Sequence, residues 1–217
     1  MMIKKTIVIL LFVFLVSGCT RDWNIANSGL DDDSSILPSP GEEVVTDSGM
    51  FDDQGNSDSN KPVDEMSHSE FIDFIGDMAC ESMRKTGVPA SVTVAQAIQE
   101  TGWGKYTIED AKNLFGVKGV GTAGSIEVET RECNVAGDCY TTSAKFRKYN
   151  SFQESVDDHA QIFSLPYYRE AMKHIDDPDE FARQLTGVYA TDPNYGSNLI
   201  SIMKSNDLYA YDAKCRD

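Results

Sequence analysis

An acidic residue ends a predicted helix in the stretch AQAIQETGWGKY, residues 95–106. Apolar residues at helical spacing run up to Glu100, and glycines then flank Trp103, so the helix is expected to stop there. A carboxyl group beside an apolar wall is poorly solvated, which raises its pKa and allows it to donate a proton at neutral pH. Trp103 and the region of Phe115 could supply that wall. The alternative interpretation is an exposed glutamate, a glycine stop and a core tryptophan.

A second acidic group lies in a segment with the alternation of a β-hairpin, SIEVETREC followed by CYTTSAKFRKY. The first strand offers Glu127, Glu129 and Glu132. Successive side chains of a strand point to opposite faces, so Glu132 shares a face with Ile126 and Val128. That face is expected to pack inward, which favours Glu132 as a second carboxylate. A β-bulge would undo this parity, and a solvated acidic strand is the alternative.

Helices dominate the framework that must hold these acids. From about residue 67, five stretches carry apolar residues at helical spacing after a typical helix start. The predicted starts are Ser67, Pro89, Ser151, Asp177 and Asp192. The hairpin lies between the second and third helices, so the predicted class is α+β, mainly α. A helix that ends in a glutamate and leads to a β-lobe forming the opposite wall of a cleft is the layout of lysozyme-like glycosidases.

Four segments in order resemble the signatures of the bacterial glucosaminidase-domain family (glycoside hydrolase family 73), which includes the flagellar peptidoglycan hydrolase and Gram-positive autolysins. They are AQAIQETGWGKY, NLFGVKG, AKFRKYNSFQESVDDHAQIF and YATDPNYGSNLISIM, and the resemblance covers residues 67–211. It implies an endo-β-N-acetylglucosaminidase without a cofactor, which cleaves peptidoglycan at the β-1,4 bond between N-acetylglucosamine and N-acetylmuramic acid. The alternatives are a cell-wall-binding lipoprotein without activity, and a muramidase or lytic transglycosylase on the same fold.

The resemblance also implies roles for single residues. Glu100 matches the general acid of the family, and Glu132 matches the glutamate of its T-x-E hairpin pattern. Tyr189 resembles a tyrosine that faces the sugar or its acetamido group; a core aromatic is the alternative. The expected substrate-binding residues are Trp103, Asn113, Phe115, Gly116 and Asp158. For Asp158, a helix-surface or capping role is the alternative.

The histidines do not predict a metal site. His68, His159 and His174 have no ligand spacing, and no metal or other cofactor is expected. The chain is expected to act as a monomer on peptidoglycan glycan strands.

The N-terminus predicts export. Residues 1–18 contain two lysines and then the apolar run TIVILLFVFLV, which is typical of a signal peptide. The run closes with LVSGC, which resembles a bacterial lipobox in which Cys19 is acylated; an ordinary secretory signal is the alternative. We expect a lipid-anchored protein of the cell envelope, in the outer membrane if the host is Gram-negative, facing the periplasm or the exterior.

Residues 19–65 are expected to form a disordered tether to a catalytic domain at residues 66–217. From residue 20 to residue 65 the chain has twelve acidic residues against Arg21 and Lys61, a net charge of −10. Such a segment buries too little apolar surface to fold. Its acidity also disfavours nucleic acid or an anionic lipid surface as a partner.

Four cysteines remain for an exported domain once Cys19 is set aside. Three pairings are possible. Cys133 and Cys139 flank the expected turn of the hairpin, so we expect them to lie opposite one another and to bond. Cys80 lies in the first helix and would then fasten Cys215 in a frayed C-terminal tail. The alternative is four free thiols.

Overall fold

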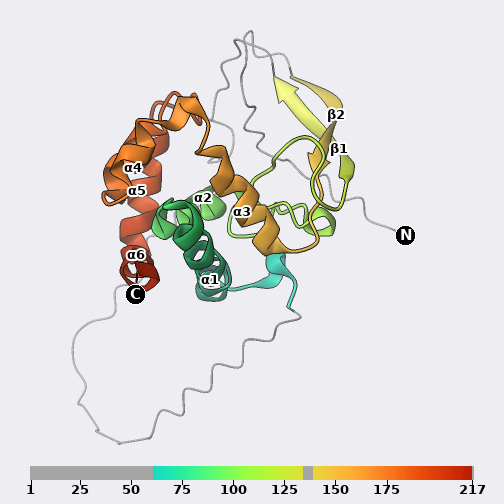
Figure 1. The fold of residues 1–217 in the computed structure, drawn as a ribbon. Coiled ribbons are helices and arrows are strands. Elements are labelled where there is room, and N and C mark those ends of the chain that lie inside the picture. Colours follow the sequence, from blue (N-terminus) through green and yellow to red (C-terminus); the bar gives the residue numbers. More distant parts are fainter. Residues whose placement is uncertain (1–60, 134–138, 217) are drawn as a thin grey trace, which may run out of the picture.

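The computed structural model describes residues 61–133 and 139–216, apart from the side chain of Glu109 and some side chains near the tip of the hairpin. Within these residues six α-helices form a body, and a two-stranded antiparallel sheet projects from it as a lobe (Figure 1). In chain order the helices are α1 (His68–Thr86), α2 (Ala90–Thr101), α3 (Phe152–Ile162), α4 (Pro178–Gln184), α5 (Tyr195–Ser205) and α6 (Tyr209–Arg216). The predicted mainly α class with a small β-lobe is confirmed.

Helix α2 forms the centre of the body. Every residue from Ala90 to Ile98 is buried, and α2 packs against α1, α4, α5 and α6 (Figure 1). Small and β-branched side chains occupy all of these positions except Gln96, so the neighbouring helices can cover α2 on every side. Its last turn, which carries Glu100, lies where the chain leaves the body for the β-lobe.

Local signals set the ends of the first two helices. Ser67 and Glu70 form a complete capping box at the start of α1, in which the Ser67 N–H donates to the Glu70 carboxylate over 2.7 Å. Gly87 ends α1 and Gly102 ends α2, both in the left-handed conformation, with φ of 80° and 55°. The predicted end of the second helix is therefore confirmed, and Glu100 lies in its last turn.

The β-lobe is the predicted hairpin. Strand β1 (Ser125–Cys133) pairs antiparallel with β2 (Cys139–Arg147). Three residues, Ile108, Ala111 and Phe146, form a small buried cluster. The partly buried side chains of Ile126, Val128 and Ala144 pack against it from the inner face of the hairpin. Glu127 and Glu129 are exposed. The parity expected for the first half of β1 is therefore confirmed.

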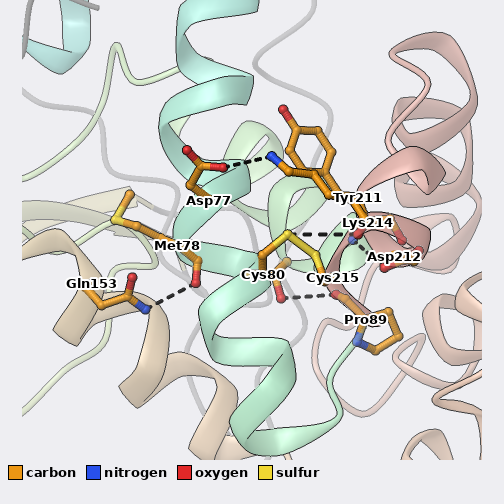
Figure 2. The surroundings of a disulfide bond; sticks show 11 residues. Asp77, Met78, Cys80, Pro89, Gln153, Tyr211, Asp212, Lys214 and Cys215 are labelled. Carbon is orange, nitrogen blue, oxygen red and sulfur yellow. Dashed lines mark hydrogen bonds and ion pairs between the residues drawn. A yellow bond between two sulfur atoms is a disulfide. The ribbon is translucent and has the colours of Figure 1, made fainter. Parts of the chain in front are cut away.

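A disulfide ties the two ends of the helical body together. Cys80 in α1 is bonded to Cys215 in α6, at a sequence separation of 135 and a Cα–Cα distance of 5.0 Å (Figure 2). This bridge was predicted, but the expectation of a frayed C-terminal tail is wrong. Residues 209–216 form a helix whose Asp212 accepts a hydrogen bond of 3.0 Å from the backbone N–H of Ser91. The bridge thus fastens an ordered element that docks on α2.

The second predicted disulfide stays a prediction. The register of the hairpin places Cys133 directly opposite Cys139, as expected. Their side chains lie outside the described part of the structure.

The N-terminal predictions fall on residues 1–60, which lie outside the described residues; these include the signal peptide, Cys19 and most of the tether. The packed domain begins slightly before residue 66, because Val63 in the short 3₁₀ helix η1 (Val63–Glu65) is buried in the core. Among the described helices, none has the length and apolar character needed to cross a membrane.

Candidate active site

Glu100 lines a small pocket at the end of α2, in which the free space is about that of one water molecule. The other lining residues all belong to the segment that connects α2 to the β-lobe; they are Tyr106, Ile108, Asn113, Leu114, Phe115 and Gly116. The residue as a whole is partly exposed, while protein surrounds most of its carboxyl group.

A chain of two hydrogen bonds holds the Glu100 carboxyl group. The hydroxyl of Tyr195 donates to Glu100 Oε1 over 3.1 Å, and Gln96 Nε2 donates to the Tyr195 hydroxyl over 2.9 Å. Burial raises the pKa of Glu100 well above its usual value, and the hydrogen bond from Tyr195 opposes this rise. A raised pKa favours the protonated form of the carboxyl group, which is the form that a general acid needs.

Tyr189 belongs to the same group of side chains. Its ring stacks on that of Tyr195, with centroids 5.4 Å apart, and its hydroxyl lies 3.3 Å from His159 Nε2. Burial and then the charge of Glu100 raise the pKa of Tyr189 well above its usual value. The structure therefore brings together Glu100 and Tyr189, two of the three predicted catalytic residues, with Tyr195 between them.

The loop that forms the pocket wall is organised by a buried amide. Asn113 donates from Nδ2 to the carbonyls of Val117 and Arg147 at 3.0 and 2.9 Å, and its Oδ1 accepts from the Val117 N–H at 3.1 Å. Gly116 has a positive φ of 61°, and a Cβ atom there would meet open space. Phe115 stacks on His159. Three of the predicted substrate-binding residues thus line one pocket.

Comparison with known proteins assigns the chain to a family. Residues 76–208, more than half of the chain, match the family described as Glucosaminidase: Mannosyl-glycoprotein endo-beta-N-acetylglucosaminidase. The chain belongs to the glucosaminidase family. The exo-glucosaminidase LytG of Bacillus subtilis (strain 168) is 36% identical over 161 residues, and the match covers 70% of this chain and 57% of LytG.

Two further proteins show the range of relatives. A probable N-acetylmuramidase of Lactococcus lactis subsp. lactis (strain IL1403) is 35% identical over 151 residues, covering 65% of this chain and 34% of that protein. The solved catalytic domain of the autolysin Auto from Listeria monocytogenes superimposes with a TM-score of 0.63 at 32% identity, covering 67% of this chain and 87% of the domain. The chain thus spans about half or less of the two curated relatives, but most of the solved domain.

Trp103 is not among the residues that line the pocket of this glucosaminidase domain. The residue has a positive φ of 63°. Its ring stacks on His68, with centroids 3.7 Å apart, and meets the edge of Phe71. Leu114 and Phe115 supply the apolar lining beside Glu100 instead. The substrate-binding role of Trp103 stays a prediction. In the structure its ring packs against other side chains of the helical body.

Asp158 also lies outside the lining of the Glu100 pocket. Both of its carboxylate oxygens accept hydrogen bonds of 2.7 Å from Arg147 Nη1, and one accepts a third from Tyr149 at 2.6 Å. This arrangement joins the end of β2 to α3. A substrate contact for Asp158 stays a prediction.

Glu132 is described by its backbone alone. It pairs with Tyr140 in the hairpin and continues the alternation of Ile126 and Val128, while its side chain lies outside the described residues. Its role as the second carboxylate therefore stays a prediction.

Three residues of this site were missed by sequence reasoning. Gln96 and Tyr195 were treated as helix positions, and His159 was considered only as a metal ligand. One signal for Gln96 was present, because a residue four positions before Glu100 lies on the same face of the helix. Among the described side chains, no group of three or more His, Cys, Asp or Glu could hold a metal ion.

Proposed function

We propose that this glucosaminidase-family chain is a peptidoglycan hydrolase that cleaves the β-1,4 bond between N-acetylglucosamine and N-acetylmuramic acid. The observation that carries the proposal is the hydrogen bond from Tyr195 to a desolvated Glu100 that lines a small pocket. Glycoside hydrolysis requires one carboxylic acid that protonates the leaving oxygen, and a raised pKa favours the protonated form of that acid.

Glu100 is the general acid in this mechanism. After it has given its proton to the leaving sugar oxygen, its carboxylate carries a full negative charge in a poorly solvated place. The Tyr195 hydroxyl then donates to an ionised oxygen, and such a hydrogen bond is about twice as strong as a neutral one. The contact therefore stabilises the negative charge that develops on Glu100 in the transition state more than it stabilises the protonated carboxyl group. Gln96 holds Tyr195 in the donating orientation.

The substrate lies over the pocket wall. Phe115 and Gly116 form the floor of the pocket. Tyr106 is 47% exposed and offers an aromatic face beside Glu100, on which a sugar ring can stack. The Tyr106 ring rests against Gly102, where a Cβ atom would come within 2.9 Å of the ring. Glu132 of β1 supplies the second carboxylate, and Tyr189 contacts the sugar or its acetamido group.

Digestion of purified peptidoglycan tests the bond that is cleaved. Products are reduced with borohydride and their ends are identified by mass spectrometry. Reduced N-acetylglucosaminitol ends are expected. Reduced muramitol ends would instead establish muramidase activity, which the similarity to a probable N-acetylmuramidase makes the second candidate, and anhydro ends would establish a lytic transglycosylase. Binding without products would favour a cell-wall-binding module. Fragments longer than a disaccharide are expected from an endo-acting enzyme, whereas LytG is named an exo-glucosaminidase.

The site of action is part of the same proposal. The signal at residues 1–18 directs export, Cys19 is acylated, and the acidic segment up to the domain tethers the enzyme in the cell envelope. Labelling with a fatty-acid analogue is expected to mark the wild-type chain in membranes and to miss a Cys19→Ala variant. Equal labelling of both chains, or a wild-type chain released from membranes, would contradict the anchor.

A further inference from the structure

His159 of α3 is a fully buried imidazole that contacts both the pocket wall and Tyr189. Its ring stacks on Phe115, with centroids 3.8 Å apart and planes at 14°. Its Nε2 lies 3.3 Å from the Tyr189 hydroxyl. Within the described residues, Nδ1 has no hydrogen-bond partner. The imidazole therefore makes one polar contact, and that contact is to the tyrosine expected at the sugar.

The charge and tautomer of His159 follow from these surroundings. Burial lowers its pKa to about 3, so the ring is neutral at working pH. A neutral imidazole carries its hydrogen on one nitrogen only. A hydrogen on Nδ1 would leave a buried donor without an acceptor, which is rarer in proteins than an unsatisfied acceptor. The favoured tautomer therefore carries its hydrogen on Nε2 and donates it to Tyr189.

An apolar ring would fill the same space without an unsatisfied nitrogen. Burial of an unpaired polar atom costs stability, so an imidazole at this position indicates that its single hydrogen bond has a use. That bond occupies the Tyr189 oxygen as an acceptor. It turns the hydroxyl hydrogen of Tyr189 away from α3 and fixes the rotation of the hydroxyl group.

We propose that His159 is a positioning residue that, as a neutral Nε2–H donor, sets Tyr189 to donate its own hydroxyl hydrogen to the substrate. The acceptor on the substrate is a carbonyl or hydroxyl oxygen of the sugar. Phe115 stacks on the same imidazole, so His159 links the position of the pocket wall to that of Tyr189. This inference rests on the proposed function and adds a residue that does not touch the substrate.

Two matched variants separate the hydrogen bond from simple packing. The side-chain amide of His159→Gln reaches the position of Nε2, and that of His159→Asn reaches the position of Nδ1. We expect His159→Gln to retain most of the activity and His159→Asn to lose ~10- to 100-fold in kcat, the scale of a misplaced group near the chemistry. KM should change less than kcat. Equal losses in the two variants would assign His159 to packing alone.

A double-mutant cycle tests whether His159 acts through Tyr189. Tyr189→Phe removes the hydroxyl, so His159→Asn is expected to cause no further loss in that background. Additive losses would overturn the proposal. Tyr168→Phe is the matched control, because Tyr168 is another buried tyrosine beside Tyr189 with no part in the hydrogen bond, and its activity should match the wild type.

Nitrogen NMR of the wild-type chain provides a readout that does not depend on activity. The chain has three histidines, so the His159 signals are assigned by their absence from a variant. We expect the nitrogen chemical shifts of His159 to be those of a neutral ring with its hydrogen on Nε2. These shifts should not change between pH 5 and pH 8. A ring that titrates in this range, or one with hydrogen on Nδ1, would overturn the proposal even if peptidoglycan is cleaved. Conversely, the expected shifts in a chain that cleaves no glycan would contradict the proposed function and not the hydrogen bond.

Discussion

The hydroxyl of Tyr195 in α5 donates a hydrogen bond of 3.1 Å to Oε1 of Glu100 in α2, across 95 positions of the chain. The contact has two opposed consequences. It lowers the pKa of Glu100 against the larger rise caused by burial, and it stabilises the carboxylate that remains after proton transfer. A residue from the far end of the domain thus moderates the pKa that burial gives this acid.

Glu100→Gln should abolish most hydrolysis while it leaves the fold intact. The amide has nearly the same shape but cannot donate an acid proton, and general acid catalysis is typically worth ~10²–10⁴-fold. Turnover of purified glycan strands and the thermal unfolding curve are measured together. Turnover like the wild type, with an unchanged unfolding curve, would overturn the assignment of Glu100.

The same substitution should change how stability depends on pH. The folded protein binds the Glu100 proton at pH values where the unfolded chain has released it, since an unfolded glutamate has a pKa of about 4.3. The contribution of this proton to folding is complete below that value and is lost as the pH rises toward the raised folded pKa. Urea unfolding from pH 4 to pH 8 should therefore show Glu100→Gln gaining stability over the wild type with increasing pH. A difference that stays constant across this range would contradict a raised pKa.

Tyr195→Phe should shift the alkaline limb of the pH–rate profile upward and reduce kcat. Loss of the hydrogen bond removes a contact that lowers the pKa of Glu100, and it leaves the carboxylate less stabilised. It also leaves the Gln96 amide without its partner, which should cost roughly 1–3 kcal/mol in the free energy of unfolding. Tyr211→Phe, which loses a hydrogen bond to Asp73 at an exposed site, is the control and should leave the profile unchanged. If the alkaline limb of the pH–rate profile is the same in Tyr195→Phe and the wild type, then Tyr195 does not influence the pKa of Glu100.

Glu132→Gln should reduce turnover by ~10²-fold or more, as expected for the second carboxylate. Glu127→Gln is the matched control from the same strand, because Glu127 is exposed and accepts a hydrogen bond of 2.6 Å from Ser143. Its turnover should match the wild type. A larger loss in Glu127→Gln than in Glu132→Gln would show that the alternation predicted for the outer half of β1 is wrong.

Replacement of both Cys80 and Cys215 by serine should lower stability by up to about 4–5 kcal/mol, the upper value of the chain-entropy model for so long a loop. Turnover below the unfolding temperature should persist, because α1 and α6 contribute nothing to the pocket lining. Calorimetry measures the first effect and product release the second. Non-reducing peptide mapping of the wild type should join Cys80 to Cys215; a peptide joining Cys80 to Cys133 or Cys139 would contradict the scheme.

The features predicted from the sequence are those set by local signals. The capping box at Ser67, the glycine stop after Glu100 and the alternation of the hairpin each depend on a few neighbouring residues, and the structure has all three. The Glu100 side chain was recognised because it lies at such a signal.

Contacts between distant segments were not predicted. Nothing near Tyr195 in the sequence indicates Glu100 as its partner. Helix α6 is short and polar, and it is held by its own Cys215 and by Leu208, which directly precedes it; both are buried in the core. Trp103 was expected beside the acid because it follows it closely in sequence. Its positive φ goes with a ring that faces His68, a direction that spacing alone does not indicate.

The burial of α2 on all sides determines how the acid can move. A helix that contacts four others has no low-energy local opening, so its amide hydrogens exchange with solvent mainly when the whole domain unfolds. Glu100 lies in the last turn of this helix, so the proposed proton donor is held by an element that four other helices contact. Any adjustment to a bound molecule would then fall to the connecting loop that lines the rest of the pocket.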